Sequence, residues 1–159
     1  MSTNITLERP DTPDAIALIL ELEAELDPLY PRASRHGYSV DKLIAQGVIF
    51  FVVRSDGAAA GCGGVQLFGA EYGELKRMYV RPAFRRRGLA RKLLSALAAE
   101  CVEHGYTRLS WAVLNWNVDA IALYDAVGGV PQTEWTTYRV SGPELITLAG
   151  ESPTAPRRD

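Results

Sequence analysis

The chain has 159 residues, of which 47% are hydrophobic and 23% charged, with a net charge of −2 and a pI of about 5.7. This length suits one domain, and the acidic balance argues against a dedicated nucleic-acid binder. Cys62 and Cys101 lack CxxC spacing and a neighbouring histidine cluster, so we expect free thiols and no metal site. The first residues lack the basic and apolar regions of a signal peptide, and no run approaches the roughly 18 apolar residues of a membrane span. These features predict a cytoplasmic protein that binds neither nucleic acid nor membrane.

The first half of the chain contains two helix starts among several strand patterns. Thr12-Pro13-Asp14 begins a helix, because threonine caps it, proline fits the first turn and aspartate suits the positive helix end. Ser39 caps a second, shorter helix that Gly47 stops. We expect the strand over residues 58–69 to be weak or bulged, because it contains several glycines. Strands are predicted over residues 5–10, 48–55, 58–69 and 73–80.

The second half alternates helical and strand patterns. A helix begins within residues 85–91 and ends at His104-Gly105, and a second helix covers 117–127. Strands are predicted over 107–114 and 134–140, followed by a closing turn over 141–150. The order β α α β β β α β α β predicts an α/β fold, with a mixed central sheet of about six to seven strands and helices on both faces. We expect one domain over residues 1–150 and a flexible tail over 151–159.

The stretch RRRGLARKLL, residues 85–94, connects a strand to a helix. A helix N-terminus presents unpaired N–H groups and the positive end of the helix dipole, and Gly88 allows a ligand to approach the backbone closely. Such a turn suits phosphate oxygens, which neighbouring arginines can also pair. It is neither a Walker P-loop nor a dinucleotide fingerprint, since GxxxxGK[ST] and GxGxxG are both absent.

The pattern Arg85-x-x-Gly88-x-Ala90 after ELKRMYV resembles the acetyl-CoA pyrophosphate motif of the GNAT superfamily of N-acetyltransferases. A second block, LSWAVLNWNVDAIALYDAVGG, is similar to a later strand and helix of that family. The order of the predicted elements is also the GNAT order. The resemblance covers roughly residues 5 to 140 and implies the GNAT fold, acetyl-CoA as co-substrate and an amine as acceptor.

The resemblance also implies where acetyl-CoA binds. The backbone at the end of the fourth strand would pair with the pantetheine arm like an added β-strand. Asn117 would contact the pantetheine or hold splayed strands, with Ala120 one turn further along the helix. The residues implied for cofactor binding are Met78, Tyr79, Val80, Arg85, Arg86, Arg87, Gly88, Leu89, Ala90, Arg91, Asn117 and Ala120.

The chemistry needs a base for the amine, a donor for the carbonyl oxygen and an acid for the leaving thiolate. Tyr124 stands where many family members place the general acid. Glu74 is the carboxylate on the fourth strand that could take the amine's proton through water; the alternative is a solvent-facing glutamate near Lys76. Cys101, on the apolar face of a helix, is not expected to be a nucleophile.

The acceptor is the point on which the two parts of the sequence differ. The C-terminal third resembles diamine and thialysine acetyltransferases, whereas Lys76 and Arg77 would repel a polyamine and attract a carboxylate. The interpretation that reconciles them is a small primary amine that carries an acid group. Protein N-terminal or lysine acetylation, a non-catalytic CoA-binding module and a homodimer remain alternatives or additions. The residues expected to bind the acceptor are Tyr30, Arg32, Arg35 and Lys76.

Overall fold

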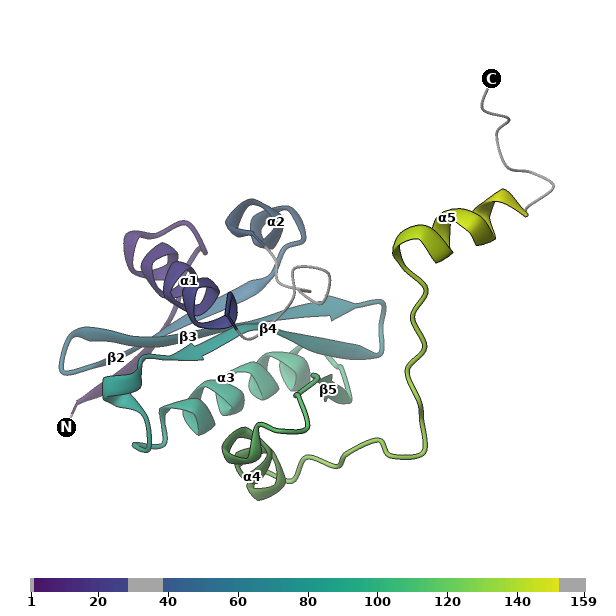
Figure 1. The fold of residues 1–159 in the computed structure, drawn as a ribbon. Helices are drawn as coiled ribbons and strands as arrows, with labels where there is room; N and C mark the ends of the chain where they lie inside the picture. Colours follow the sequence, from purple (N-terminus) through teal and green to yellow (C-terminus); the bar gives the residue numbers. More distant parts are fainter. Residues whose placement is uncertain (1, 29–38, 152–159) are drawn as a thin grey trace. The chain divides into compact units, whose positions relative to one another are not determined.

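The computed structural model describes residues 2–28 and 39–151, which form a mixed sheet with helices on both of its faces (Figure 1). The sheet has the order β1-β2-β3-β4-β5, antiparallel except for the parallel pair β4 and β5. The strands are β1 (Thr3–Leu7), β2 (Ile49–Ser55), β3 (Ala58–Phe68), β4 (Tyr72–Val80) and β5 (Arg108–Ser110). The helices are α1 (Pro13–Leu26), α2 (Val40–Ala45), the 3-10 helix η2 (Pro82–Phe84), α3 (Leu89–Glu103), α4 (Val118–Ala126) and α5 (Gly142–Gly150).

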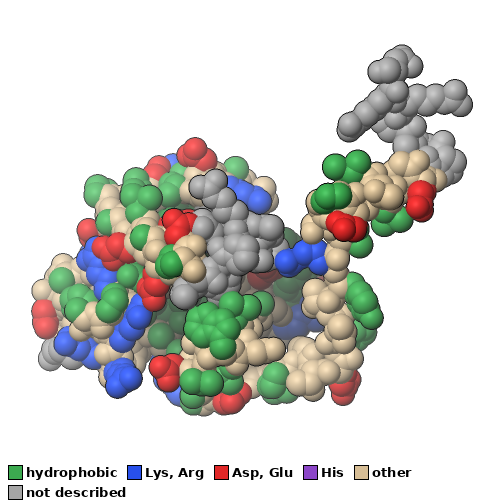
Figure 2. Space-filling view, viewed as in Figure 1, with side chains coloured by type: hydrophobic (Ala, Val, Ile, Leu, Met, Phe, Trp, Pro, Cys, Tyr) green, Lys and Arg blue, Asp and Glu red, His purple; other side chains and the backbone are tan. Residues whose placement is uncertain are grey.

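The chain divides into two compact units, Met1–Leu123 and Tyr124–Asp159. The first contains the whole sheet with α1, α2 and α3, and the second begins within α4 and includes α5. The prediction of one domain over residues 1–150 stays a prediction. Among the described residues, no helix is both long and apolar enough to cross a membrane. Figure 2 shows acidic and basic side chains interspersed over the visible face of the first unit.

Two hydrophobic clusters, one on each face of the sheet, hold the first unit together. On one face α1 and α2 pack through Leu18 and Leu43 against Phe50 and Val52 of β2. On the other face α3 packs through Leu93, Leu97 and Cys101. Burying a large aliphatic side chain contributes roughly 1.5–3 kcal/mol. The α/β fold with a mixed sheet is therefore confirmed.

The sheet is smaller than the sequence predicts, because the described chain has five strands where six to seven were expected. β5 covers only Arg108–Ser110 of the predicted strand 107–114, and residues 134–140 form no strand. Trp135 and Tyr138 in that segment are 79% and 91% exposed. Alternation of residue types favours a strand, but a strand also needs a neighbour for its backbone hydrogen bonds. The expected closing turn is the nine-residue helix α5.

With its glycines, β3 is 11 residues long, the longest strand among the described residues. The glycines let its neighbours approach: a Cβ on Gly61 would lie 2.6 Å from the carbonyl oxygen of Tyr79, and one on Gly64 would lie 2.7 Å from Val48. The expected bulge is present, because Val53 pairs with Gly61 and Arg54 with Ala59, which leaves Ala60 as an extra residue of β3. The glycines thus permit close packing rather than loose pairing.

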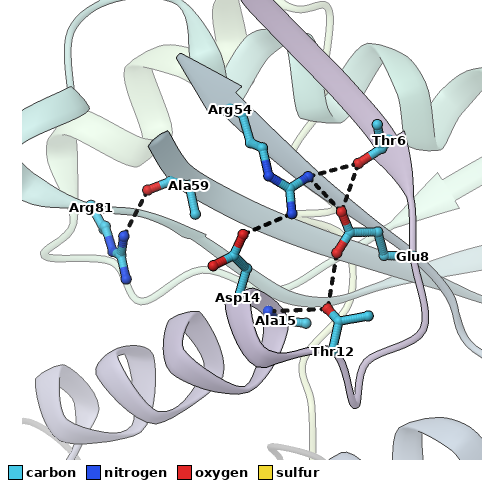
Figure 3. A network of polar contacts seen from close by, with 8 residues as sticks. All are labelled: Thr6, Glu8, Thr12, Asp14, Ala15, Arg54, Ala59 and Arg81. Atoms are coloured by element: carbon cyan, nitrogen blue, oxygen red, sulfur yellow. Dashed lines mark hydrogen bonds and ion pairs between the residues drawn. The ribbon is translucent and has the colours of Figure 1, made fainter. Parts of the chain in front are cut away.

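A polar network fastens the N-terminus of α1 to β1 and β2 (Figure 3). Arg54 donates to Glu8 at 2.5 Å, to Asp14 at 2.8 Å and to Thr6 at 2.9 Å. The hydroxyl of Thr12 donates to Glu8 and accepts from the N–H of Ala15, as the predicted helix cap. Burial alone would raise the pKa of Glu8, but the hydrogen bonds from Arg54, Thr6 and Thr12 outweigh it and lower that pKa.

We predict that Glu8→Gln lowers the free energy of unfolding at pH 7 by about 1–3 kcal/mol, the typical contribution of hydrogen bonds to a charged group. A carboxylate with a depressed pKa stabilises the fold above its unfolded pKa and loses this effect as pH falls through the folded pKa. The difference between wild type and variant should therefore shrink below about pH 4. Urea unfolding at several pH values measures it, with the exposed Glu103→Gln as control. Equal losses in both variants would contradict the prediction.

Candidate active site

The strands β4 and β5 separate after a short common stretch. Within the described residues they pair only at Tyr72, Gly73 and Glu74 of β4, so β4 continues to Val80 without β5 beside it. The N–H of Arg81 donates to Ala60 of β3 at 2.8 Å. Peptide groups alternate sides along a strand, so those of Val80 turn toward the edge away from β3. Part of this edge could pair with an extended ligand, as the resemblance implied for Met78, Tyr79 and Val80, although the carbonyl oxygen of Val80 accepts from Arg85.

A bulge in β4 changes which side chains lie on its two faces. The pairs Gly64↔Lys76 and Cys62↔Tyr79 leave Arg77 and Met78 opposite the single residue Gly63. Arg77 has a φ of 52°, in the left-handed region. Its side chain pairs with Glu23 of α1, so it lies on the α1 face, while the Cβ of Gly63 would contact Met78 and Leu97 on the α3 face. The bulge therefore brings the consecutive cations Lys76 and Arg77 to one face.

The loop between β4 and α3 has the turn and helix start that the sequence predicted, and anion binding there stays a prediction. Gly88 is the N-cap of α3 with a φ of 77°, and Arg86 also has a positive φ of 64°. Gly88 brings no side chain to cap the helix, and the first N–H groups of any α-helix lack intrahelical acceptors. A Cβ on Gly88 would meet nothing within 4 Å. N–H groups without a side-chain cap, next to a glycine whose Cβ position is open, are compatible with binding a pyrophosphate.

The side chains of this loop divide between the interior and the surface. Leu89 is 3% exposed and Ala90 packs against the same cluster, so these two offer a ligand only their backbone. Arg86 and Arg91 are exposed, and the guanidinium of Arg87 lies 5.5 Å from the ring centre of Phe84. The arginines predicted to bind the cofactor therefore surround the backbone site rather than fill it.

Arg85, the first residue of the motif, forms its hydrogen bonds with other residues of the protein. Its Nε donates to the carbonyl oxygen of Val80 at 2.8 Å, and its Nη2 donates to both carboxylate oxygens of Glu25 at 2.8 and 3.0 Å. The guanidinium also lies 5.8 Å from the ring centre of Tyr79. Arg85 thus ties the loop to the end of β4 and to α1.

Arg85 is one of three arginines that pair with glutamates of α1, and we call this set the α1 ladder. Arg81 donates to both carboxylate oxygens of its partner at 2.8 Å and to Ala59 of β3 at 2.8 Å. The three pairs are Glu21–Arg81, Glu23–Arg77 and Glu25–Arg85. The ladder fixes α1 against the part of β4 that has no neighbour in β5.

The sequence did not predict the α1 ladder, in which every second residue from Glu21 to Glu25 takes part. The sequence does contain the residues of both kinds, with glutamates on one predicted helix and arginines around the end of a predicted strand. Only the packing of α1 on β4 matches each glutamate to its arginine.

The helix α4 carries the remaining predicted residues. Asn117 caps it, since its Oδ1 accepts from the N–H of Ala120 at 3.3 Å and its carbonyl accepts from Ile121 at 3.0 Å. Tyr124 follows one turn after Ala120, at the start of the second unit. Asn117 therefore has a structural use, and the ligand contacts of Asn117, Ala120 and Tyr124 stay predictions.

The predicted acceptor and base residues are only partly described. Tyr30, Arg32 and Arg35 lie outside the described residues. Glu74 and Lys76 form an ion pair at 2.9 Å, and Lys76 is 11% exposed. Glu74 is directly opposite Gln66 of β3, whose side chain the sequence did not single out.

Neither cysteine is suited to nucleophilic catalysis. Cys62 is fully buried and donates from Sγ to the carbonyl oxygen of Arg77 at 3.3 Å. Burial raises the pKa of Cys62 to about 12, and burial also raises that of Cys101. Thiols rather than thiolates are therefore present at neutral pH, and only thiolates attack readily.

Comparison with known proteins decides the family. Residues 16–128 match the model of the acetyltransferase (GNAT) family. The chain belongs to this family. The predicted acetyl-CoA-dependent N-acetyltransferase is thereby confirmed at the level of the family, and the open edge of β4 with the uncapped start of α3 fits the acetyl-CoA on which the family depends.

Three similar proteins illustrate the breadth of the family. An IAA acetyltransferase of Azospirillum brasilense is 31% identical over 94% of this chain and 98% of its own length. A thialysine N-epsilon-acetyltransferase of Caenorhabditis elegans is 45% identical, over 51% of this chain; the match spans only 52% of that relative's length. The crystal structure of a putative acyl-CoA N-acyltransferase from Klebsiella pneumoniae has a TM-score of 0.63 and 33% identity, covering 78% of this chain and 80% of that one.

Replacing Gly88 by tryptophan should weaken acetyl-CoA binding at least tenfold, because the side chain would occupy the space in front of the uncapped N–H groups. Gly105 provides a matched control: it has a φ of 80°, it is equally open, and it lies beyond the opposite end of α3. Gly88→Trp and Gly105→Trp therefore carry similar backbone strain. Calorimetric titration with acetyl-CoA compares them. Unchanged affinity in Gly88→Trp would place the pyrophosphate elsewhere.

Proposed function

We propose that this protein transfers the acetyl group of acetyl-CoA directly to the primary amine of a small molecule. The observation that carries the proposal is the free edge of β4, which leads to the uncapped N-terminus of α3. Family membership supports the donor, and the ion-paired Glu74 and Lys76 on the same strand support a polar acceptor.

The residues of the chain have separate tasks in binding. The N–H groups from Arg86 to Arg91, centred on Gly88, hold the pyrophosphate, and the outward arginines add charge. The edge of β4 at Met78, Tyr79 and Val80 aligns the pantetheine arm. Arg85 contributes by holding the carbonyl of Val80 and so fixing the angle between strand and loop.

The reaction forms an N–C bond and breaks a C–S bond, and acetyl-CoA supplies an acetyl group already activated as a thioester. Glu74 accepts the proton that the amine loses, through a water molecule. A backbone N–H near Met78 to Val80 donates to the carbonyl oxygen as negative charge develops there. Tyr124 gives a proton to the departing sulfur. The products are an acetamide and CoA, and no side chain is acylated.

The acceptor we propose is a small primary amine that also carries a carboxylate. Two relatives are named for acceptors of this kind, a thialysine N-epsilon-acetyltransferase and an L-ornithine N5-acetyltransferase of Arabidopsis thaliana, which the chain matches over about half or less of their length. The bulge in β4 places Lys76 and Arg77 on the same face; Arg77 is engaged by Glu23 of α1, so Lys76, which pairs with Glu74, is the cation that we assign to the acid group.

Two other functions use the same fold. A protein N-terminus or lysine as acceptor would require peptide substrates and show no turnover of free amines. A CoA-binding regulatory module would bind acetyl-CoA and transfer nothing. The uncapped start of α3 is compatible with both, so substrate assays distinguish them.

A matched amine series tests the acceptor. L-lysine and 6-aminohexanoate carry a carboxylate, whereas cadaverine and n-pentylamine do not, and all four present the same terminal amine. We expect kcat/KM, measured by release of the CoA thiol, to be about tenfold higher for the first two. Tenfold corresponds to about 1.4 kcal/mol, within the range of one charge-assisted hydrogen bond.

In Lys76→Met the preference for amines that carry a carboxylate should disappear, while the KM for acetyl-CoA should not change. A preference for cadaverine would reverse the assignment of the acid group. If no amine of the series were acetylated but peptides were, the result would favour a protein as acceptor.

Replacing Tyr124 by phenylalanine should lower kcat by a factor of about 100 or more, the typical effect of a general acid, and leave acetyl-CoA affinity unchanged. Tyr138→Phe is the control, because Tyr138 is 91% exposed in the same unit. Stopped-flow measurement of thiol release separates turnover from binding. Full activity in Tyr124→Phe would remove this residue as the acid.

A further inference from the structure

We propose that Gln66 is an acceptor-binding residue whose side-chain oxygen accepts a hydrogen bond from the amine that is to be acetylated. The inference rests on the proposed function and names a residue on β3, next to the strand that carries the other polar groups of the site. It concerns how the reacting amine is held, independently of what the rest of the acceptor looks like.

The first observation is an unpaired polar atom in the interior. Gln66 is 6% exposed, and among the described residues its Oε1 has no hydrogen-bond partner. Its Nε2 donates to Oε1 of Gln46, at the end of α2, at 3.4 Å. An unpaired buried oxygen costs roughly 1–3 kcal/mol, so a residue used only for packing would be better replaced by an apolar one of similar size. Within the described part of the chain no donor reaches this oxygen, so an acceptor amine that enters the site can supply one.

The second observation is the neighbourhood of Gln66. Gln66 and Glu74 are directly opposite each other on β3 and β4, and opposed residues of antiparallel strands point to the same face. Lys76, two residues along β4, lies on that face and donates to Glu74 at 2.9 Å. The unpaired oxygen of Gln66 therefore stands beside the carboxylate that we assign as the base.

The chemistry of this pair selects a donor of two hydrogen bonds. A neutral primary amine has two N–H groups and one lone pair, so it can donate toward Gln66 and toward the water next to Glu74, with the lone pair left for the thioester. A thiol or alcohol has only one hydrogen to donate. The pair of acceptors thus orients the nucleophile, and orientation is a large part of rate enhancement.

A position near the reacting carbon follows from the strand. Glu74 is the last residue of β4 that pairs with β5, and the free edge begins with the next residue. Gln66 pairs with Glu74, so it stands at the level along β4 at which β4 and β5 separate. The same oxygen would be of no use to a ligand on the α3 face, where Val65 and Leu75 pack.

The test uses Gln66→Met, which keeps the length of the side chain and removes its acceptor. We expect the KM for n-pentylamine, cadaverine, 6-aminohexanoate and L-lysine to rise about tenfold or more, and equally for all four, because they share the terminal amine. The KM for acetyl-CoA should stay the same. The melting temperature of the variant without ligands should change little, since removal of the unpaired oxygen offsets loss of the long hydrogen bond to Gln46.

The matched control is Gln46→Met, which removes the partner of Nε2 and leaves Oε1 of Gln66 in place. It should change the amine KM less than threefold. Equal effects on the amine KM in both variants, or a loss confined to the acceptors with a carboxylate, would each overturn the inference.

Binding of n-pentylamine in the presence of CoA, measured by calorimetry, decides the inference without turnover. Turnover by wild type with unchanged amine KM in Gln66→Met overturns the role of Gln66 alone. Amine binding that Gln66→Met weakens, without turnover by wild type, supports Gln66 and overturns the proposed function. Absence of both binding and turnover in wild type overturns both.

Discussion

The attachment of α1 to the end of β4 is the constraint on which the candidate site depends. At this end β4 lacks β5 as a neighbour, so the hydrogen bonds of a second strand do not hold its position there. The α1 ladder supplies side-chain contacts instead, at intervals along the helix and the strand. A free strand edge is useful to a ligand only if it keeps its shape before the ligand arrives, because ordering it on binding would cost affinity.

The three pairs of the ladder differ in what they contribute. The outer pairs of Arg81 and Arg85 have side chains that are 29–43% exposed, and exposed ion pairs typically contribute 0–1 kcal/mol. Arg77 is 6% exposed, whereas its partner Glu23 is 34% exposed, so this pair is buried on the arginine side only. The inner pair therefore loses less to solvent screening than the outer pairs do, and it holds the arginine of the bulge.

The bulge itself is held from both sides of its backbone. The guanidinium of Arg77 reaches α1, while its carbonyl oxygen accepts from Sγ of Cys62 in β3. This explains why Cys62 is buried without being reactive: its thiol is a hydrogen-bond donor to a strained residue. A left-handed arginine costs of order 1–3 kcal/mol and persists where the surroundings fix it.

Local signals in the sequence predict most of the fold, and long-range ones are missing. Thr12 and Ser39 cap helices as expected, because a cap depends on residues within one turn. The strand predicted over 134–140 is absent from the structure, since the pattern of its residues does not show whether another strand lies beside it to pair with. The same limit applies to the site. The Gly88 turn is readable from six consecutive residues, whereas the ladder and the buried oxygen of Gln66 depend on pairing between strands and helices far apart in the chain.

The three consecutive arginines illustrate the difference between charge and geometry. Three positive side chains at a helix start suggest that phosphate binding is a matter of charge. Yet Arg85 is neutralised by Glu25 and bound to Val80, so its contribution is to hold the loop. The positive φ values of Arg86 and Gly88 turn the backbone, and no side chain caps the N–H groups of α3. Backbone dipoles fixed in this way need no rearrangement when an anion binds, unlike long exposed side chains that must be ordered first. In the function that we propose, the arginine at the start of the motif thus serves the anion site by fixing the backbone that forms it.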